Sequence, residues 1–92
     1  MAKVLCTRVA EGLRASEAIV TIQDLQGRRH DVRIERDFLS GHNGHSYLPV
    51  DIVHQDARTG AFLIELPLEA ETGANRLWIR PEDLLEPTEA PT

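Results

Sequence analysis

Apolar side chains recur at every second position over much of the chain between residues 50 and 79. Clusters rich in Gly, Asp, Asn and Thr interrupt this alternation. Successive side chains of a strand point to opposite faces of a sheet, so the pattern predicts short strands with one buried face. The alternating set comprises Val50, Ile52, Phe62, Ile64, Leu66, Leu77 and Ile79. The chain is therefore predicted to be a small antiparallel β domain.

Residues 17–35 are predicted to form a β-hairpin whose register follows from the pattern. The apolar faces of its two arms coincide only if the loop has an odd number of residues. Pairing Asp24 with Arg28 leaves Leu25-Gln26-Gly27 as the loop, which suits a type I turn followed by Gly in the left-handed conformation. This register pairs Val20 with Val32, Ala18 with Ile34 and Thr21 with Asp31.

Asn43-Gly44 predicts a second hairpin over residues 38–48, because both central positions of a type I′ turn need positive φ. Pro49 has no amide hydrogen to donate, so we expect it to end this ladder or to mark a sheet edge. The predicted pairs are His42 with His45, Ser40 with Tyr47 and Leu39 with Leu48.

Further strands are expected at residues 50–54, 61–66 and 76–80, followed by a helical turn over 81–85 that begins at Pro81. Residues 86–92 contain only Glu, Pro, Thr and Ala, which predicts a disordered acidic tail.

The N-terminal segment fits two structures. Residues 3–9 can form a strand, whereas apolar side chains at the spacing of a helical stripe also fit a helix. The strand is favoured because Gly12 and several β-branched residues weaken the helix. The helical stripe consists of Cys6, Val9, Ala10 and Leu13.

About six short strands without a long helix must pack against a second sheet or close into a barrel. For a chain of 92 residues we expect the barrel. The predicted fold is an all-β, single-domain, antiparallel SH3-like barrel over residues 1–85, with one short helical turn near its C-terminal end.

The runs Tyr47-Leu-Pro-Val-Asp-Ile-Val and Phe62-Leu-Ile-Glu-Leu, separated by a turn, give residues 46–85 an apolar spacing that resembles the second half of PRC-barrel domains. A strand, a turn beginning at Pro and a final apolar pair likewise resemble the close of SH3-like barrels. The resemblance implies a small assembly or RNA-processing module, and no functional residue is carried over from it.

Charge and cysteine content narrow the functional classes. The formal charge of −5 arises in residues 61–92, where seven acids face only Arg76 and Arg80. A strong positive field is absent, so nucleic acid is not the expected partner. The single Cys6 rules out an internal disulfide, and Met1-Ala-Lys-Val is not followed by an apolar run of signal-peptide length. We expect a cytoplasmic protein without a membrane segment or a cofactor.

Trp78 is the first candidate for a binding residue. Leu77 and Ile79 occupy one strand face, which places Trp78 on the other face beside Arg76 and Arg80. Such a ring can serve as a contact platform, or it can be covered by the arginine stems. Leu63 also falls on an outer face, so a protein partner or a second copy of the chain is the expected ligand. The predicted partner-binding set is Trp78, Arg76, Arg80 and Leu63.

Two alternatives use other residues. Arg28, Arg29, Arg33 and Arg36 share one hairpin arm and could contact RNA, although interleaved acids favour a salt-bridged surface. His42 and His45 would face each other across the Asn-Gly turn and could share a metal, although a solvated pair is favoured because zinc needs further ligands.

Catalysis has little support in the sequence. It contains no Gly-rich phosphate loop, nucleophile elbow or His-Glu-x-x-His motif. Cys6 lies in an apolar segment, where thiols are inert. Asp51, Asp56 and Glu65 form no predicted pocket, so we expect no enzyme activity.

Overall fold

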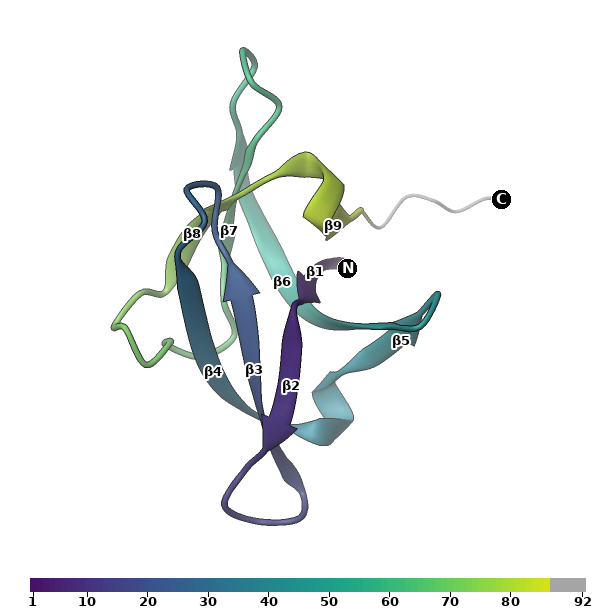
Figure 1. Cartoon of the computed structure of the whole chain (residues 1–92). Helices are drawn as coiled ribbons and strands as arrows, with labels where there is room; N and C mark the ends of the chain where they lie inside the picture. Colours follow the sequence, from purple (N-terminus) through teal and green to yellow (C-terminus); the bar gives the residue numbers. More distant parts are fainter. Residues whose placement is uncertain (87–92) are drawn as a thin grey trace.

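The computed structural model describes residues 1–86 of the chain. In this range the protein has nine strands and two three-residue 3₁₀ helices, and every strand pair is antiparallel (Figure 1). The predicted antiparallel all-β architecture is confirmed, whereas residues 87–92 of the predicted tail lie outside the described residues. The strands are β1 Ala2–Cys6, β2 Arg8–Glu11, β3 Glu17–Gln23, β4 Arg29–Glu35, β5 Ser40–His42, β6 His45–Gln55, β7 Phe62–Glu65, β8 Arg76–Ile79 and β9 Leu84–Leu85; the helices are η1 Arg36–Phe38 and η2 Pro81–Asp83.

The strands form two sheets rather than one continuous cylinder. One sheet has the order β8-β7-β6-β1-β9, with β5 added to β6, and the other has the order β2-β3-β4 (Figure 1). No closed barrel is found within residues 1–86, because β8 and β4 each end their sheet without pairing to each other.

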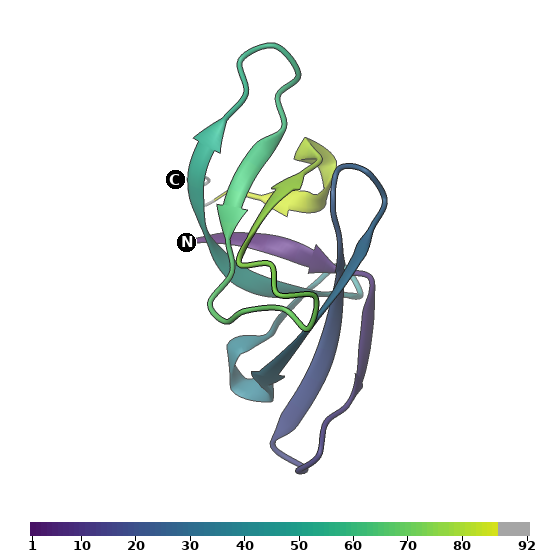
Figure 2. The ribbon, with the colours of Figure 1, turned by 90° about the vertical axis from the view of Figure 1, so that its left-hand side faces the viewer.

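The N-terminal segment is a strand rather than a helix, as predicted, but a bend divides it. The chain turns sharply at Thr7 between β1 and β2, so these strands belong to different sheets (Figure 2). The Thr7 amide donates to the Thr21 carbonyl at 2.8 Å, which fixes the bend to β3. Val4 and Cys6 of β1 are buried.

Both predicted hairpins form with the predicted central pairs. In β3–β4, Val20 pairs with Val32, and the loop ends at Gly27 with a φ of 86°. In β5–β6, His42 pairs with His45 around Asn43-Gly44, where φ is 52° and 81°. One detail was wrong: residues 36–38 form η1, pairing starts at Ser40, and Leu39 is not paired with Leu48.

β6 is longer than predicted because it continues through Pro49. Its pairing with β5 ends at Tyr47, and its pairing with β7 begins at Asp51. Pro49 therefore lies in a short stretch of open edge, where a missing amide hydrogen removes no ladder bond on that side. On its other edge β6 pairs with β1 without interruption from Ser46 to Val50.

The core is aliphatic and draws on both sheets. As the alternation required, Val20 and Phe62 are buried, and Tyr47 is the other buried aromatic residue in the part of the chain that the structure describes. The largest fully buried side chains are Ile22, Leu48, Ile64, Ile79, Val4, Val20 and Val32.

The C-terminal part of the described chain returns to the first strand. Residues 81–83 form a helical turn, shorter than the predicted 81–85, because Leu84 and Leu85 form β9, in which Leu84 pairs with Val4. The sequence did not predict this pairing. Neither helix in residues 1–86 is long or apolar enough to cross a bilayer.

Candidate functional site

The outer face of β6, β7 and β8 carries a row of three side chains from three strands. Leu63 on β7 pairs with Trp78 on one side and with His54 on the other. The rings of His54 and Trp78 meet edge to face with centroids 6.2 Å apart. Trp78 is 38% exposed, so its indole is neither buried in the core nor fully solvated. The sheet thus presents a fixed aromatic ring beside an apolar neighbour.

His54 was missed at the sequence level because β6 contains a bulge. Ile52 pairs with Ile64, but His54 pairs with Leu63, which leaves Val53 as the extra residue. The extra residue reverses the face of every later side chain in the strand. Strict alternation would have placed His54 on the face of Ile52, and no local residue such as Gly marks the bulge.

The four predicted partner-binding residues do not form one cluster. Arg76 pairs across the strands with Glu65, and their side chains form an ion pair at 3.3 Å. The Arg80 side chain instead forms an ion pair with Asp83 of η2 at 3.1 Å. Leu63 and Trp78 are direct neighbours, Arg76 borders them, and Arg80 lies where the chain leaves β8.

A gap separates the outer edge of β8 from the β3–β4 hairpin, and we call it the seam. Residues 24–31 line one side and residues 71–78 the other. Two backbone hydrogen bonds cross it in place of a strand ladder. The Leu25 amide donates to the Trp78 carbonyl at 2.7 Å, and the Glu71 amide donates to the Asp31 carbonyl at 2.8 Å. The seam is where the two sheets fail to close on each other.

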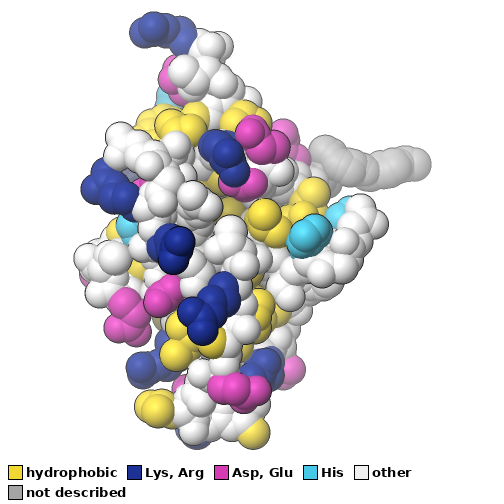
Figure 3. Space-filling model, viewed as in Figure 1, with side chains coloured by type: hydrophobic (Ala, Val, Ile, Leu, Met, Phe, Trp, Pro, Cys, Tyr) yellow, Lys and Arg dark blue, Asp and Glu magenta, His cyan; other side chains and the backbone are white. Residues whose placement is uncertain are grey.

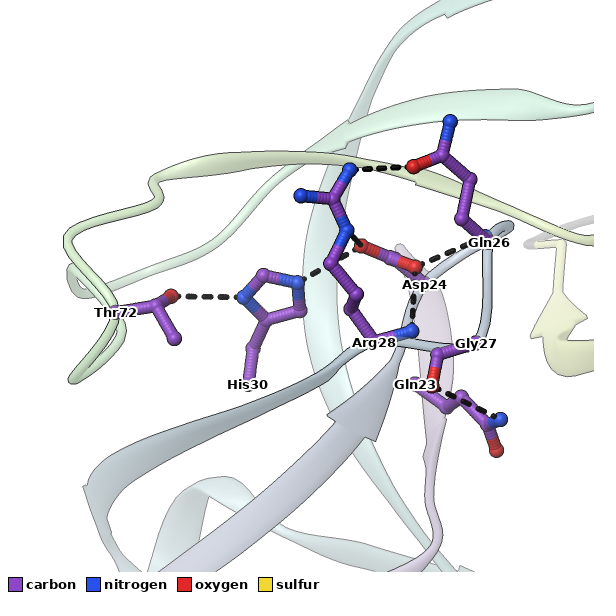
Figure 4. Close-up of polar contacts among 7 residues, drawn as sticks. All are labelled: Gln23, Asp24, Gln26, Gly27, Arg28, His30 and Thr72. Carbon is purple, nitrogen blue, oxygen red and sulfur yellow. Dashed lines mark hydrogen bonds and ion pairs between the residues drawn. The ribbon is translucent and has the colours of Figure 1, made fainter.

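A buried histidine also ties the two sides of the seam together (Figure 4). His30 Nε2 lies 2.9 Å from Asp24 Oδ2, and its Nδ1 lies 2.8 Å from Thr72 Oγ1. A carboxylate only accepts, so Nε2 carries the proton; in the neutral ring Nδ1 then accepts from the Thr72 hydroxyl. The two contacts join the β3–β4 turn, β4 and the loop before β8.

The order carboxylate, imidazole, hydroxyl also occurs in hydrolase triads. In such a triad the imidazole must pass a proton to the leaving group of the substrate. His30 is only 8% exposed and both ring nitrogens face a protein partner. The geometry therefore suits a structural link better than proton transfer to a substrate.

Asp24 is held in its charged form by this network. Partial burial of the carboxylate disfavours its charged form. The hydrogen bonds from the His30 ring and from the backbone amides of Arg28 and Gln26 favour the charged form, and together their effect is larger than that of burial. The pKa of the Asp24 carboxyl consequently lies below its ordinary value. Arg28 adds an ion-pair contact at 3.8 Å.

A groove of about 280 Å³ opens along the seam beside Trp78, and we call it the seam groove. Its apolar lining residues are Leu25, Ala74, Leu77 and Trp78. The remaining lining residues are polar or charged: Asp24, Gln26, Arg28, His30 and Arg76.

The arginine arm is largely salt-bridged. Arg28 contacts Asp24, Arg33 reaches Glu71 at 4.0 Å, and Arg36 bonds to Glu11 at 3.1 Å. On the face shown in Figure 3, basic side chains in dark blue are interspersed with acidic ones in magenta. Arg29 instead lines a polar groove of about 460 Å³ that also contains Arg8.

His42 and His45, the predicted metal candidates, pair across the β5–β6 turn as predicted. The ring of His42 meets Tyr47 edge to face at 6.2 Å, and within residues 1–86 no group of three or more His, Cys, Asp or Glu side chains is placed to hold a metal ion. Cys6 is buried, and burial raises the pKa of its thiol to about 12. A thiol of this kind is a poor nucleophile at neutral pH.

Comparison of the chain with protein-family models, with curated proteins and with solved structures found no match.

Proposed function

We propose that this domain is a cytoplasmic, non-catalytic protein-interaction or assembly module of the small SH3-like barrel type. Its contact surface centres on Trp78 and Leu63, with Arg76 and Arg80 at the border. The ligand is a protein partner or a second copy of the chain.

One observation carries the proposal: the indole of Trp78 is held half-exposed on a paired strand, between Leu63, His54 and the seam groove. Large aromatic side chains dominate the binding energy of protein interfaces. A ring already fixed by its neighbours loses little conformational entropy when a partner covers it. Arg76 and Arg80 lie beside the indole and can form ion pairs with carboxylates of a partner. To do so, Arg76 gives up its ion pair with Glu65, and Arg80 gives up its ion pair with Asp83.

The two alternatives receive less support. Three of the four arm arginines, Arg28, Arg33 and Arg36, already contact acids, which weakens the case for an RNA-associated module. A metal-bound domain built on His42 and His45 lacks further donors among the described residues.

The test is affinity capture from native cell extract with three proteins: the natural chain, Trp78→Ala and Leu13→Ala. Leu13 is 82% exposed and lies in the β2–β3 loop, so it is a matched change of an exposed apolar residue. We expect Trp78→Ala to lose the captured partner, or to lose self-association in light scattering, while Leu13→Ala retains it. Both variants should still melt cooperatively.

Two results would contradict the proposal. If Trp78→Ala unfolds, the ring is a core residue and not a contact. If it melts normally and still captures the same partner at the same level, the contact surface lies elsewhere.

A further inference from the structure

We propose that the seam groove binds one extended, acidic peptide segment of a partner protein, which adds as a strand to the open edge of β8. This inference rests on the proposed function and specifies the chemistry of the ligand. Three features of the described residues carry it: the direction of the β8 backbone groups, the shape of the groove and the sign of its exposed charge.

The backbone of β8 points unpaired groups into the seam. In an antiparallel strand, the N–H and C=O of one residue point to the same side and alternate along the chain. The Trp78 carbonyl accepts from Leu25, so the polar groups of Trp78 point away from β7. The Trp78 N–H and both groups of Arg76 must point the same way. Within residues 1–86, the Leu25 amide is the only backbone group that bonds to β8 on this outer side.

An edge of this kind is complementary to an extended peptide. An added strand supplies donors and acceptors at the same alternating spacing, and its alternate side chains enter adjacent pockets. The groove volume of about 280 Å³ suits one or a few side chains. Leu25 and Trp78, which are 43% and 38% exposed, provide the apolar contact.

The exposed charge of the groove is positive. Arg28 and Arg76 have side chains 72% and 55% exposed, and each contacts one acid, Asp24 and Glu65 respectively. Asp24, the only acid in the lining, is 12% exposed and is also engaged by His30. The adjoining hollow shares Arg28, His30 and Ala74 with the groove and adds Arg29 without any acid. The chain as a whole carries a net charge of −5, so this basic strip is a local feature. It favours a segment that carries carboxylates.

The backbone groups favour a peptide over a nucleic acid that is held by its phosphates. Phosphates only accept hydrogen bonds, so they can satisfy the N–H groups of Arg76 and Trp78 but not the Arg76 carbonyl. A peptide strand satisfies both kinds of group. Binding of RNA in the groove is therefore the competing outcome in the test.

The probe is the synthetic peptide acetyl-Glu-Val-Glu-Val-Glu-Val-amide. Trp78 is the only tryptophan of the chain, so its fluorescence reports occupation of the groove directly. We expect saturable binding, with amide NMR shifts concentrated at Arg76 and Trp78. A peptide with Lys in place of Glu should not bind. A peptide methylated on alternate backbone nitrogens should bind at least tenfold more weakly. Methylation removes the N–H groups that would donate hydrogen bonds to the backbone of β8. Arg28→Glu should also weaken binding at least tenfold.

Three results would overturn the inference: no change in Trp78 fluorescence or in the two amides at millimolar peptide, equal binding of the methylated peptide, or stronger binding of a uridine oligonucleotide in the groove. The methylated peptide changes the probe and leaves the protein intact, so this control does not depend on the folding of a variant. If Trp78-dependent partner capture persists but the peptide does not compete with it, the proposed function stands and only the strand-addition mode fails.

Discussion

The backbone amide of Leu25, at the tip of the β3–β4 hairpin, donates a hydrogen bond to the carbonyl of Trp78 on β8 at 2.7 Å. The bond joins the two sheets at the point where a barrel would otherwise close through a strand ladder. It also holds the candidate contact residue against the groove beside it. A change at this one position is therefore expected to affect both stability and the candidate contact surface.

Leu25→Pro tests this bond while preserving the turn. The bond from the Gly27 amide to the Asp24 carbonyl makes Leu25 the first central residue of the turn, a position that Pro favours in type I turns. Pro has no amide hydrogen, so we expect the unfolding free energy to fall by about 1 kcal/mol in urea denaturation. Leu25→Ala keeps the amide and serves as the control. Equal losses in both variants would show that the bond contributes nothing.

Asp24 should make stability depend on pH in the acid range. Its pKa is lowered in the folded protein, so it contributes stability that is fully present above the unfolded value near 3.8 and is lost as the pH falls through the folded pKa. Urea denaturation over a series of acidic pH values should show this loss for the natural protein. Compared with the natural protein, Asp24→Asn should have a lower unfolding free energy near neutral pH and should lose less of it on acidification. The exposed control Asp37→Asn should behave like the natural protein. Parallel curves for the natural protein and Asp24→Asn would refute the role of the carboxylate.

Gly12 permits a close approach that no larger residue can reproduce. A Cβ at this position would lie 2.6 Å from Glu17 Cβ and 2.9 Å from the Glu17 carbonyl carbon. These atoms belong to β3 and cannot move aside without shifting the strand. We expect Gly12→Ala to lower the unfolding free energy by roughly 1–3 kcal/mol. Gly41→Ala, where the nearest atom lies 3.9 Å away, should change it little; a similar loss at both positions would disprove the steric explanation.

Cys6 should resist alkylation until the protein unfolds. The thiol is buried in β1, and its pKa is raised to about 12, so little thiolate forms at mildly alkaline pH. We expect iodoacetamide to modify Cys6 quickly in denaturant and very slowly in native buffer. A Cys6→Ala protein carrying the exposed change Ser16→Cys should react quickly in both. Rapid native labelling of Cys6 would mean that β1 opens readily.

The parts of the fold that the sequence predicted depend on local chemistry. Gly27 and Asn43-Gly44 supply the positive φ values that their turns require, and the alternation of apolar side chains then determines the strand pairs. Trp78 was placed on the outer face for the same reason, since both neighbours in its strand had to be buried.

The parts that the sequence did not predict depend on contacts between distant segments. Pro49 is tolerated inside β6 because β5 ends and β7 begins on either side of it, which no local pattern reveals. The Val53 bulge brings His54 to Trp78 without a marker residue. His30 meets Thr72, 42 residues later, only because the sheets stop short of closing.

Both neighbours of β1 in its sheet, β6 and β9, come from later parts of the chain. A ribosome that adds about 5–20 residues per second needs roughly 4–16 s to proceed from β1 to β9. During this interval the strand has an unsatisfied edge, and such edges pair readily with other nascent chains. Because β1 has only five residues, few of its backbone N–H and C=O groups are available for such pairing before β9 is synthesised.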